Sequence, residues 1–162
     1  MRTARHPALG FTLLELLVTL AIFATLATIA IPNFSRIVQE NRLVTTANEY
    51  KVAMSYARSE AVRRNQSVSV RPINAASWNA GWEAVISDDT ISNDDILRIW
   101  SQPHQIAVIN APEHFTFNSQ GRLVSSSFSP FKVSFTLGAA GRCVRIENSG
   151  ISRVLDSRQA CS

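Results

Sequence analysis

One uninterrupted apolar run near the N-terminus constrains this chain more than any other feature. It covers residues 11–31, and Glu15 is the only ionisable side chain within it. A membrane-crossing helix needs about 20 apolar residues, so the run is long enough to span a bilayer. A charged residue near the bilayer centre costs about 2.5–3.5 kcal/mol on insertion scales. The sequence therefore predicts a membrane helix in which Glu15 requires a partner charge.

A short basic leader precedes the run. Residues 1–10 contain Arg2 and Arg5 and end in Gly10. A secretory signal is cut after its apolar stretch, near small residues. Here the glycine stands before the apolar stretch. Cleavage after Gly10 would therefore keep the stretch in the mature protein, with Phe11 as its first residue.

The junction G-F-T-L-L-E at residues 10–15 resembles the prepilin motif of type IV pilins and type II secretion pseudopilins. The resemblance implies that a prepilin peptidase cleaves after Gly10 and methylates the new amino group of Phe11. It also implies that Glu15, the fifth mature residue, meets the terminal amine of a neighbouring subunit. That amine would supply the partner charge. The alternative is a plain N-terminal anchor with a chance Gly-Phe pair.

The basic leader also predicts the membrane topology. By the positive-inside rule, Arg2 and Arg5 place the N-terminus in the cytoplasm. The resemblance implies that this membrane is the bacterial inner membrane and that the C-terminal part lies in the periplasm. After assembly the protein would belong to a pilus or pseudopilus.

Two cysteines near the C-terminus fit an oxidising compartment. Neither Cys143 nor Cys161 belongs to a C-x-x-C motif. A lone pair outside the cytoplasm predicts a disulfide, which would add about 3 kcal/mol of stability in the chain-entropy model. Two unpaired buried thiols are the alternative.

The N-terminal helix is predicted to extend beyond the apolar run. Pro32 should disturb it, because proline removes an amide donor and crowds the preceding turn. Residues 33–64 have helical periodicity, and their apolar stripe consists of Leu43, Ala47, Tyr50, Met54, Ala57 and Ala61. The opposite face carries Arg42, Glu49, Lys51, Arg58, Glu60, Arg63 and Arg64. The alanines predict close approach of a sheet, and the cations at 63–64 predict the helix end.

Short strands are predicted after residue 65. Apolar runs separated by Gly, Asn, Ser and Pro clusters lie at 67–71, 81–86, 95–100, 106–109, 115–117, 131–137, 143–146 and from 154. This spacing is typical of antiparallel hairpins. The predicted fold class is α+β, with a long helix packed on a small antiparallel β-sheet domain. The expected parts are a leader at 1–10, a transmembrane and assembly helix at 11–31, an amphipathic half at 32–64 and a β-rich domain at 65–162.

Two further motifs refine the resemblance. The segments S-Y-A-R-S-E-A-V-R-R at 55–64 and F-N-S-Q-G-R at 117–122 resemble the GspH/FimT group of minor pilins and pseudopilins. Members of this group are thought to lie at or near a filament tip. The resemblance implies a structural component that primes or caps a type IV pilus or a type II secretion pseudopilus. Its partners would be the prepilin peptidase, other pilin or pseudopilin subunits and the inner membrane.

No catalytic or cofactor-binding motif is present in the sequence. H-E-x-x-H, G-x-S-x-G and the P-loop pattern do not occur, and His104 and His114 have no accompanying ligand pattern. We therefore expect no enzyme activity, no metal site and no cofactor. The acidic stretch at 88–95 has oxygen ligands of the kind that Ca²⁺ prefers. It lacks the EF-hand spacing, so a solvated hairpin loop is the favoured reading.

Charge is unevenly distributed along the β-rich part. Residues 73–115 carry six acidic side chains and one arginine, a balance of −5. Residues 120–162 carry six basic and two acidic side chains, a balance of +4. The asymmetry predicts an acidic face and a basic face, which could steer subunit packing or attract nucleic acid.

The basic end partly resembles a motif of FimT-type DNA receptors, which act in natural transformation. The family pattern is G-R-x-R, and residues 150–153 read G-I-S-R, which keeps only the second arginine. In the alternative function that this implies, Arg153 and Arg158 contact a DNA backbone without sequence preference. Otherwise these arginines keep the tip soluble or pair with the acidic face of a neighbour.

Overall fold

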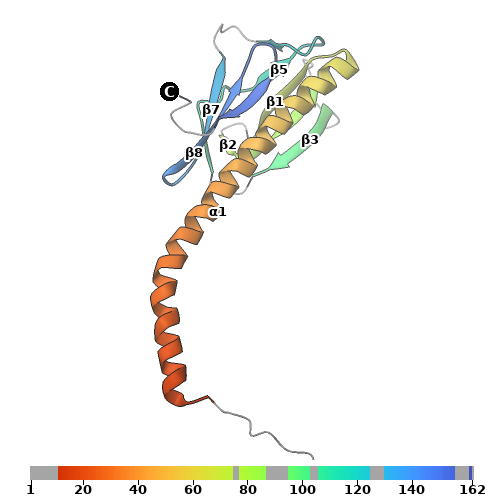
Figure 1. Cartoon of the computed structure of the whole chain (residues 1–162). Coiled ribbons are helices and arrows are strands. Elements are labelled where there is room, and N and C mark those ends of the chain that lie inside the picture. Colours follow the sequence, from red (N-terminus) through yellow and green to blue (C-terminus); the bar gives the residue numbers. More distant parts are fainter. Residues whose placement is uncertain are drawn as a thin grey trace, which may run out of the picture. The chain divides into compact units, whose positions relative to one another are not determined.

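The chain folds into one long helix followed by antiparallel strands (Figure 1). The computed structural model describes residues 11–74, 77–86, 95–102, 106–124, 130–155 and 161 of 162. The predicted α+β fold is confirmed. The chain divides into two compact units, Met1–Val38 and Gln39–Ser162. Gly10, Arg158 and residues 88–94 of the acidic stretch lie outside the described residues.

Helix α1 (Leu13–Arg64) begins at a side-chain cap. Thr12 Oγ1 accepts a hydrogen bond from the backbone N–H of Glu15 at 3.2 Å. This bond satisfies one of the free donors of the first turn. The predicted continuation of the helix past Pro32 is confirmed, because α1 runs without interruption through that position. Proline removes a single amide donor, and this loss does not end a helix of 52 residues.

The C-terminal end of α1 is a Schellman motif. Asn65 adopts a left-handed conformation with φ of 54°. The N–H of Gln66 donates to the carbonyl oxygen of Ala61 at 3.2 Å, and the N–H of Asn65 donates to that of Val62 at 3.3 Å. These two bonds satisfy carbonyl groups that the helix end would otherwise leave free. The predicted end near residues 63–65 is confirmed.

Two antiparallel sheets follow, where the sequence predicted a single one. The first sheet has the order β3-β2-β1-β5-β6 and consists of β1 (Val68–Asn74), β2 (Ser77–Ile86), β3 (Ile96–Ser101), β5 (Phe115–Phe117) and β6 (Leu123–Val124). The second has the order β4-β7-β8-β9 and consists of β4 (Ala107–Ile109), β7 (Phe131–Leu137), β8 (Ala140–Ile146) and β9 (Ser152–Leu155). The sequence missed β6, because two residues carry too little alternation to predict a strand.

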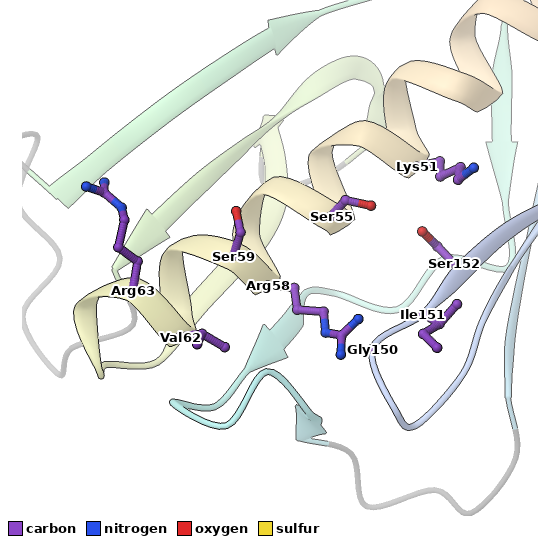
Figure 2. A pocket seen from close by; sticks show the side chains of 9 residues that line it. All are labelled: Lys51, Ser55, Arg58, Ser59, Val62, Arg63, Gly150, Ile151 and Ser152. Carbon is purple, nitrogen blue, oxygen red and sulfur yellow. The ribbon is translucent and has the colours of Figure 1, made fainter.

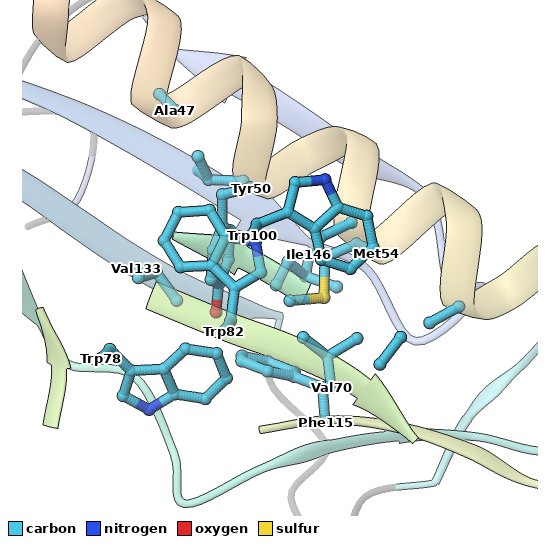
Figure 3. Packing of buried hydrophobic residues seen from close by; sticks show 14 of the residues in the cluster. Ala47, Tyr50, Met54, Val70, Trp78, Trp82, Trp100, Phe115, Val133 and Ile146 are labelled. Atoms are coloured by element: carbon cyan, nitrogen blue, oxygen red, sulfur yellow. The ribbon is translucent and has the colours of Figure 1, made fainter. Parts of the chain in front are cut away.

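The predicted apolar stripe of α1 forms the centre of the core (Figure 3). Its six members are all buried. Tyr50 makes edge-to-face contacts with Trp82 of β2 and Phe135 of β7, with ring centroids 4.9 and 5.1 Å apart. The same ring also meets Trp78 and Phe115. Because these rings come from both sheets, one side chain of the helix connects the two sheets into a single core.

Glu60 is placed differently from the prediction. The sequence assigned it to the charged, solvated face, but the residue is only 7% exposed. Its carboxylate accepts hydrogen bonds from Arg63 Nη2 at 2.6 Å and Arg64 Nε at 2.8 Å. The hydrogen bond from Arg63, followed by that from Arg64, lowers the pKa of Glu60 below its ordinary value of 4.5. Arg63 and Arg64 follow Glu60 by three and four residues, the spacing at which side chains on one helix face each other. The three residues therefore form a local triad in the last turns of α1.

The structure confirms the predicted disulfide between Cys143 and Cys161. Cys143 is buried in β8 and is opposite Leu155 of β9 in the strand register. The bond closes a loop with a sequence separation of 18, which contains β9.

Candidate functional site

The described part of the first unit exposes apolar side chains around the whole helix. Phe11, Leu13 and Leu14 are each more than 70% exposed, and Leu16 and Leu17 are more than half exposed. Among the described residues, α1 is the one helix long and apolar enough to cross a membrane. A helix that is apolar on all sides requires an apolar surrounding.

Glu15 interrupts this apolar surface within the first turn of α1. Thr12 and Glu15 have the spacing of a capping box, and the Glu15 N–H bonds the threonine hydroxyl. The carboxylate therefore belongs to the positive end of the helix dipole. Phe11 comes directly before the cap, so an amine at Phe11 and the carboxylate of Glu15 occupy the same end of the helix.

The second unit contains a groove of about 660 Å³ along α1 (Figure 2). The helix lines it with Lys51, Ser55, Arg58, Ser59, Val62 and Arg63, and the segment entering β9 lines it with Gly150, Ile151 and Ser152. Val62 is 53% exposed and Ile151 is 45% exposed. The groove thus combines positive charge with accessible apolar surface.

Three sequence motifs meet beside this groove. Arg58, from the segment 55–64, donates its Nε–H to the carbonyl oxygen of Gly121 at 3.0 Å. Gly150 packs against the same two residues, and a Cβ at that position would lie 2.5 Å from the Gly121 oxygen. The motifs that were singled out at 55–64, 117–122 and 150–153 therefore form one structural junction. Sequence reasoning found the motifs but not their contact.

The floor of the groove contains a hydroxyl without a partner. Ser152 is 6% exposed, and its Oγ has no hydrogen-bond partner among the described residues. Buried polar atoms without partners are rare in folded proteins, and each one calls for a physical explanation. In Figure 2 the Ser152 hydroxyl points toward the helix wall of the groove.

A row of basic residues crosses the second sheet. Lys132 of β7 is paired with Arg145 of β8, which is paired with Arg153 of β9, so the three share one face. Arg145 Nε lies 2.9 Å from Glu147 Oε1, within ion-pair distance but without hydrogen-bond alignment. Arg153 is exposed. The sequence predicted Arg153 but missed the other two, although the β7–β8 hairpin turn at 138–139 sets this register.

The described residues contain no group of three or more His, Cys, Asp and Glu side chains that could hold a metal ion. His104 lies outside the described residues, and so does most of the stretch considered for calcium. Neither prediction is tested by the structure.

A long N-terminal helix packed on antiparallel sheets defines a pilin-like protein. Two family models match it: Type II transport protein GspH over residues 46–150, and the prokaryotic N-terminal methylation motif over residues 5–31. The chain belongs to the GspH family, because the first match covers more than half of its length. Proteins of this kind are structural pilins and pseudopilins.

Solved structures agree with this fold. Two crystal structures of the type IV minor pilin FimU from Pseudomonas aeruginosa match with TM-scores of 0.60 and 0.59. They are 24% and 23% identical, cover 74% and 76% of this chain, and are matched over 100% and 94% of their own. The minor pseudopilin EpsH of the Vibrio cholerae Type 2 Secretion System has a TM-score of 0.51 at 16% identity, covering 71% of this chain and 97% of its own. No curated protein matches the sequence.

Proposed function

We propose that this chain is a minor pilin or pseudopilin that primes or caps a type IV pilus or a type II secretion pseudopilus. The observation that carries the proposal is the exposed apolar half of α1 with Glu15 in its first turn. Such a helix requires an apolar surrounding before assembly and an equally apolar one afterwards. A bilayer and a bundle of like helices both meet that requirement.

The processing steps follow from the N-terminal motif. Prepilin peptidase removes residues 1–10 after Gly10, and the new amino group on Phe11 is methylated. Residues 11–31 hold the protein in the inner membrane, with the N-terminus in the cytoplasm and the domain at 65–162 in the periplasm. The amphipathic half at 32–64 connects the two.

Glu15 sets the register during assembly. Apolar helices slide past one another with little directional preference, because their contacts are not specific. A carboxylate in low dielectric interacts strongly with a neighbouring ammonium, so one such pair per subunit fixes the axial position. The terminal amine of an adjacent subunit is the partner that Glu15 requires.

Substitution of Glu15 tests this mechanism. Glu15→Ala should be cleaved after Gly10 as efficiently as the parent, because the cut lies five residues earlier. Its incorporation into filaments should fall severely, whereas Glu15→Asp should retain part of it. Immunoblots of sheared filaments against membrane fractions measure both steps. Normal incorporation of Glu15→Ala would contradict the proposal.

DNA binding is a second candidate function, favoured by the basic row of Lys132, Arg145 and Arg153. Neighbouring cations on one face of a sheet can contact several phosphates of a nucleic-acid backbone without reading its sequence. The full chain in detergent micelles is titrated with duplex DNA in a gel shift, alongside Arg153→Ala and Arg158→Ala. Arg42→Ala, on an exposed part of α1, is the matched control. Absence of salt-sensitive binding at micromolar protein would exclude this function.

A further inference from the structure

We propose that the groove between α1 and the segment entering β9 is a carboxylate-binding site, and that it receives an acidic, partly apolar peptide segment of an unlike subunit. The inference rests on the proposed function, because a subunit that primes or caps a filament lies at its end and contacts subunits of other kinds. The groove belongs wholly to the second unit and is lined by described residues.

Arg58 is held in position at the centre of the groove. Its Nε–H donates to the carbonyl oxygen of Gly121 at 3.0 Å. Gly121 and Gly150 both pack against the side chain, since a Cβ on either residue would lie 3.2 Å from Nε. A guanidinium has five N–H donors, and the four on its Nη groups suit a carboxylate. Because the side chain is already ordered, a ligand loses little affinity in fixing it.

The Ser152 hydroxyl is a second, independent indication of a ligand. The residue is 6% exposed, and its Oγ has no hydrogen-bond partner among the described residues. It lines the groove, and Figure 2 shows the hydroxyl directed toward α1. An unpaired buried hydroxyl is unfavourable, and an oxygen of a ligand would accept its hydrogen bond. A peptide supplies such acceptors in its carboxylates and in its carbonyl groups.

The lining of the groove is positively charged. Lys51 is exposed at one end, and Arg58 is half-buried at the centre. Arg63 contributes little, because its Nη2 lies 2.6 Å from Glu60 Oε2. No acidic side chain is among the described residues that line the groove. The net positive charge therefore favours an anionic ligand.

Two apolar side chains make a peptide a better ligand than a nucleic acid or a free inorganic anion. Val62 and Ile151 are each about half exposed and line the same groove as the cations. Burial of these side chains is favourable only against an apolar group of the ligand. A sugar–phosphate backbone has few such groups, whereas a peptide can carry a carboxylate beside a leucine or valine.

The groove is also separate from the basic row on the second sheet. Ser152 and Arg153 are successive residues of β9, and successive side chains of a strand point to opposite faces. Ser152 is buried in the groove, whereas Arg153 is exposed and shares its face with Arg145. A ligand of the groove therefore does not need the residues proposed for DNA.

The size of the groove matches a short extended peptide. Its helical wall extends from Lys51 to Arg63, about 18 Å at 1.5 Å per residue. An extended chain advances about 3.3 Å per residue, so about five or six residues cover this length. The volume of about 660 Å³ lies within the range of about 300–1,000 Å³ typical of ligand pockets.

Peptide binding to the full chain in detergent micelles tests the chemistry of the site. The probes are fluorescein-labelled D-E-A-L-V and its reverse V-L-A-E-D, which cover both chain directions. N-Q-A-L-V and V-L-A-Q-N are the matched peptides without carboxylates. In anisotropy titrations, at least one acidic peptide should bind about ten-fold more tightly than its matched amide, and added salt should weaken it. Equal binding within both pairs would overturn the proposal.

Substitutions assign this binding to the groove. Arg58 also bonds Gly121, so its replacement would disturb the fold as well as the site. Ser152→Ala removes only the hydroxyl and should weaken the acidic peptide about three- to ten-fold without lowering the thermal stability. Ile151→Glu should weaken it about ten-fold or more, because it adds a like charge. Arg42→Gln, an exposed cation elsewhere on α1, is the control. Unchanged binding in Ser152→Ala and Ile151→Glu would exclude the groove.

Photo-cross-linking identifies the occupant in cells that assemble the filament. With p-benzoylphenylalanine in place of Val62, the product should contain another pilin or pseudopilin subunit, joined through a peptide that includes Asp or Glu. Ile151→Glu should abolish this product. The same photo-reactive residue in place of Val52, 51% exposed on α1 and outside the groove lining, should not form it. A product with a second copy of this chain, or the absence of a product that Ile151→Glu removes, would overturn the proposal.

The two proposals fail separately. Peptide binding in micelles does not depend on assembly, and the defect expected for Glu15→Ala does not depend on the groove. Loss of the groove interaction together with an intact Glu15→Ala defect removes the docking contact and leaves the proposed function standing.

Discussion

Arg58 of α1 reaches across to the loop before β6 and donates its Nε–H to the carbonyl oxygen of Gly121 at 3.0 Å. The bond is part-buried and connects residues 63 positions apart. Asn118 holds the acceptor loop internally, because its Oδ1 accepts from the N–H groups of Gln120 and Arg122. The junction thus fixes the rim of the groove.

Gly150→Ala should destabilise the second unit through this junction. The residue has φ of 79°, and a Cβ would lie 2.5 Å from the Gly121 oxygen. We expect a loss of about 2–4 kcal/mol in the free energy of unfolding, combining left-handed strain with overpacking. Gly138→Ala is the matched control, with φ of 57° but no atom closer than 3.8 Å. Chemical denaturation should give it a smaller loss, about 1–2 kcal/mol; equal losses would argue against the steric part.

Tyr50→Phe should stabilise the protein. The Tyr50 hydroxyl is fully buried and has no hydrogen-bond partner among the residues that the structure describes, and burial raises the pKa of Tyr50 well above its ordinary value. Removing the hydroxyl keeps the aromatic contacts and relieves its desolvation cost, a gain of roughly 1 kcal/mol. Tyr56→Phe, at a half-buried position, should change stability by less than about 0.5 kcal/mol. A loss of stability in Tyr50→Phe, measured by thermal unfolding, would mean that the hydroxyl is bonded.

Glu60 should contribute to acid unfolding. Its pKa is lowered below 4.5, first by the hydrogen bond from Arg63. A carboxylate with a depressed folded-state pKa stabilises the fold above its unfolded pKa, and this contribution is lost as pH falls through the folded value. Glu60→Gln should therefore flatten the pH dependence of stability below about pH 4.5. The exposed Glu113 provides the control, Glu113→Gln, which should leave the slope unchanged.

Thr12→Ala should loosen the first turn of α1. It removes the acceptor of the Glu15 N–H and costs about 1 kcal/mol of local stability. Amide hydrogen exchange in micelles should be faster at residues 13–16, while Thr12→Ser keeps the parent rates. Thr19→Ala, whose hydroxyl bonds a carbonyl rather than capping the helix, should not affect this turn. Unchanged exchange in Thr12→Ala would exclude a role for the cap.

Periodicity predicted the parts of the fold that depend on local pattern. The stripe from Leu43 to Ala61 is buried, and eight of the nine strands lie on predicted apolar runs. The division into two sheets could not be read from the sequence. It depends on pairing between distant strands, such as β1 with β5, which the turn signals do not encode.

The candidate site was predicted only in part. Arg153 was identified from a motif, whereas Lys132 and Arg145 join it through strand register. Glu60 was assigned to the face of α1 opposite the apolar stripe. Helical periodicity shows which residues share a face, but it does not show which other side chains lie over that face. The burial of Glu60 reflects local pairing with two arginines. Ser152 gave no signal, since an unpaired hydroxyl is defined by its three-dimensional surroundings alone.

The disulfide has a mechanical consequence. It joins Cys161 to Cys143 in β8, an interior strand of the second sheet, and encloses β9 in the covalent loop. A pull on the last residues would otherwise detach the four-residue edge strand one hydrogen bond at a time. With the disulfide in place, tension passes from Cys161 to β8 and not through β9. β8 is hydrogen-bonded to β7 on one side and to β9 on the other. Tension applied at Cys161 therefore reaches the interior strand β8 without first peeling β9 from the sheet.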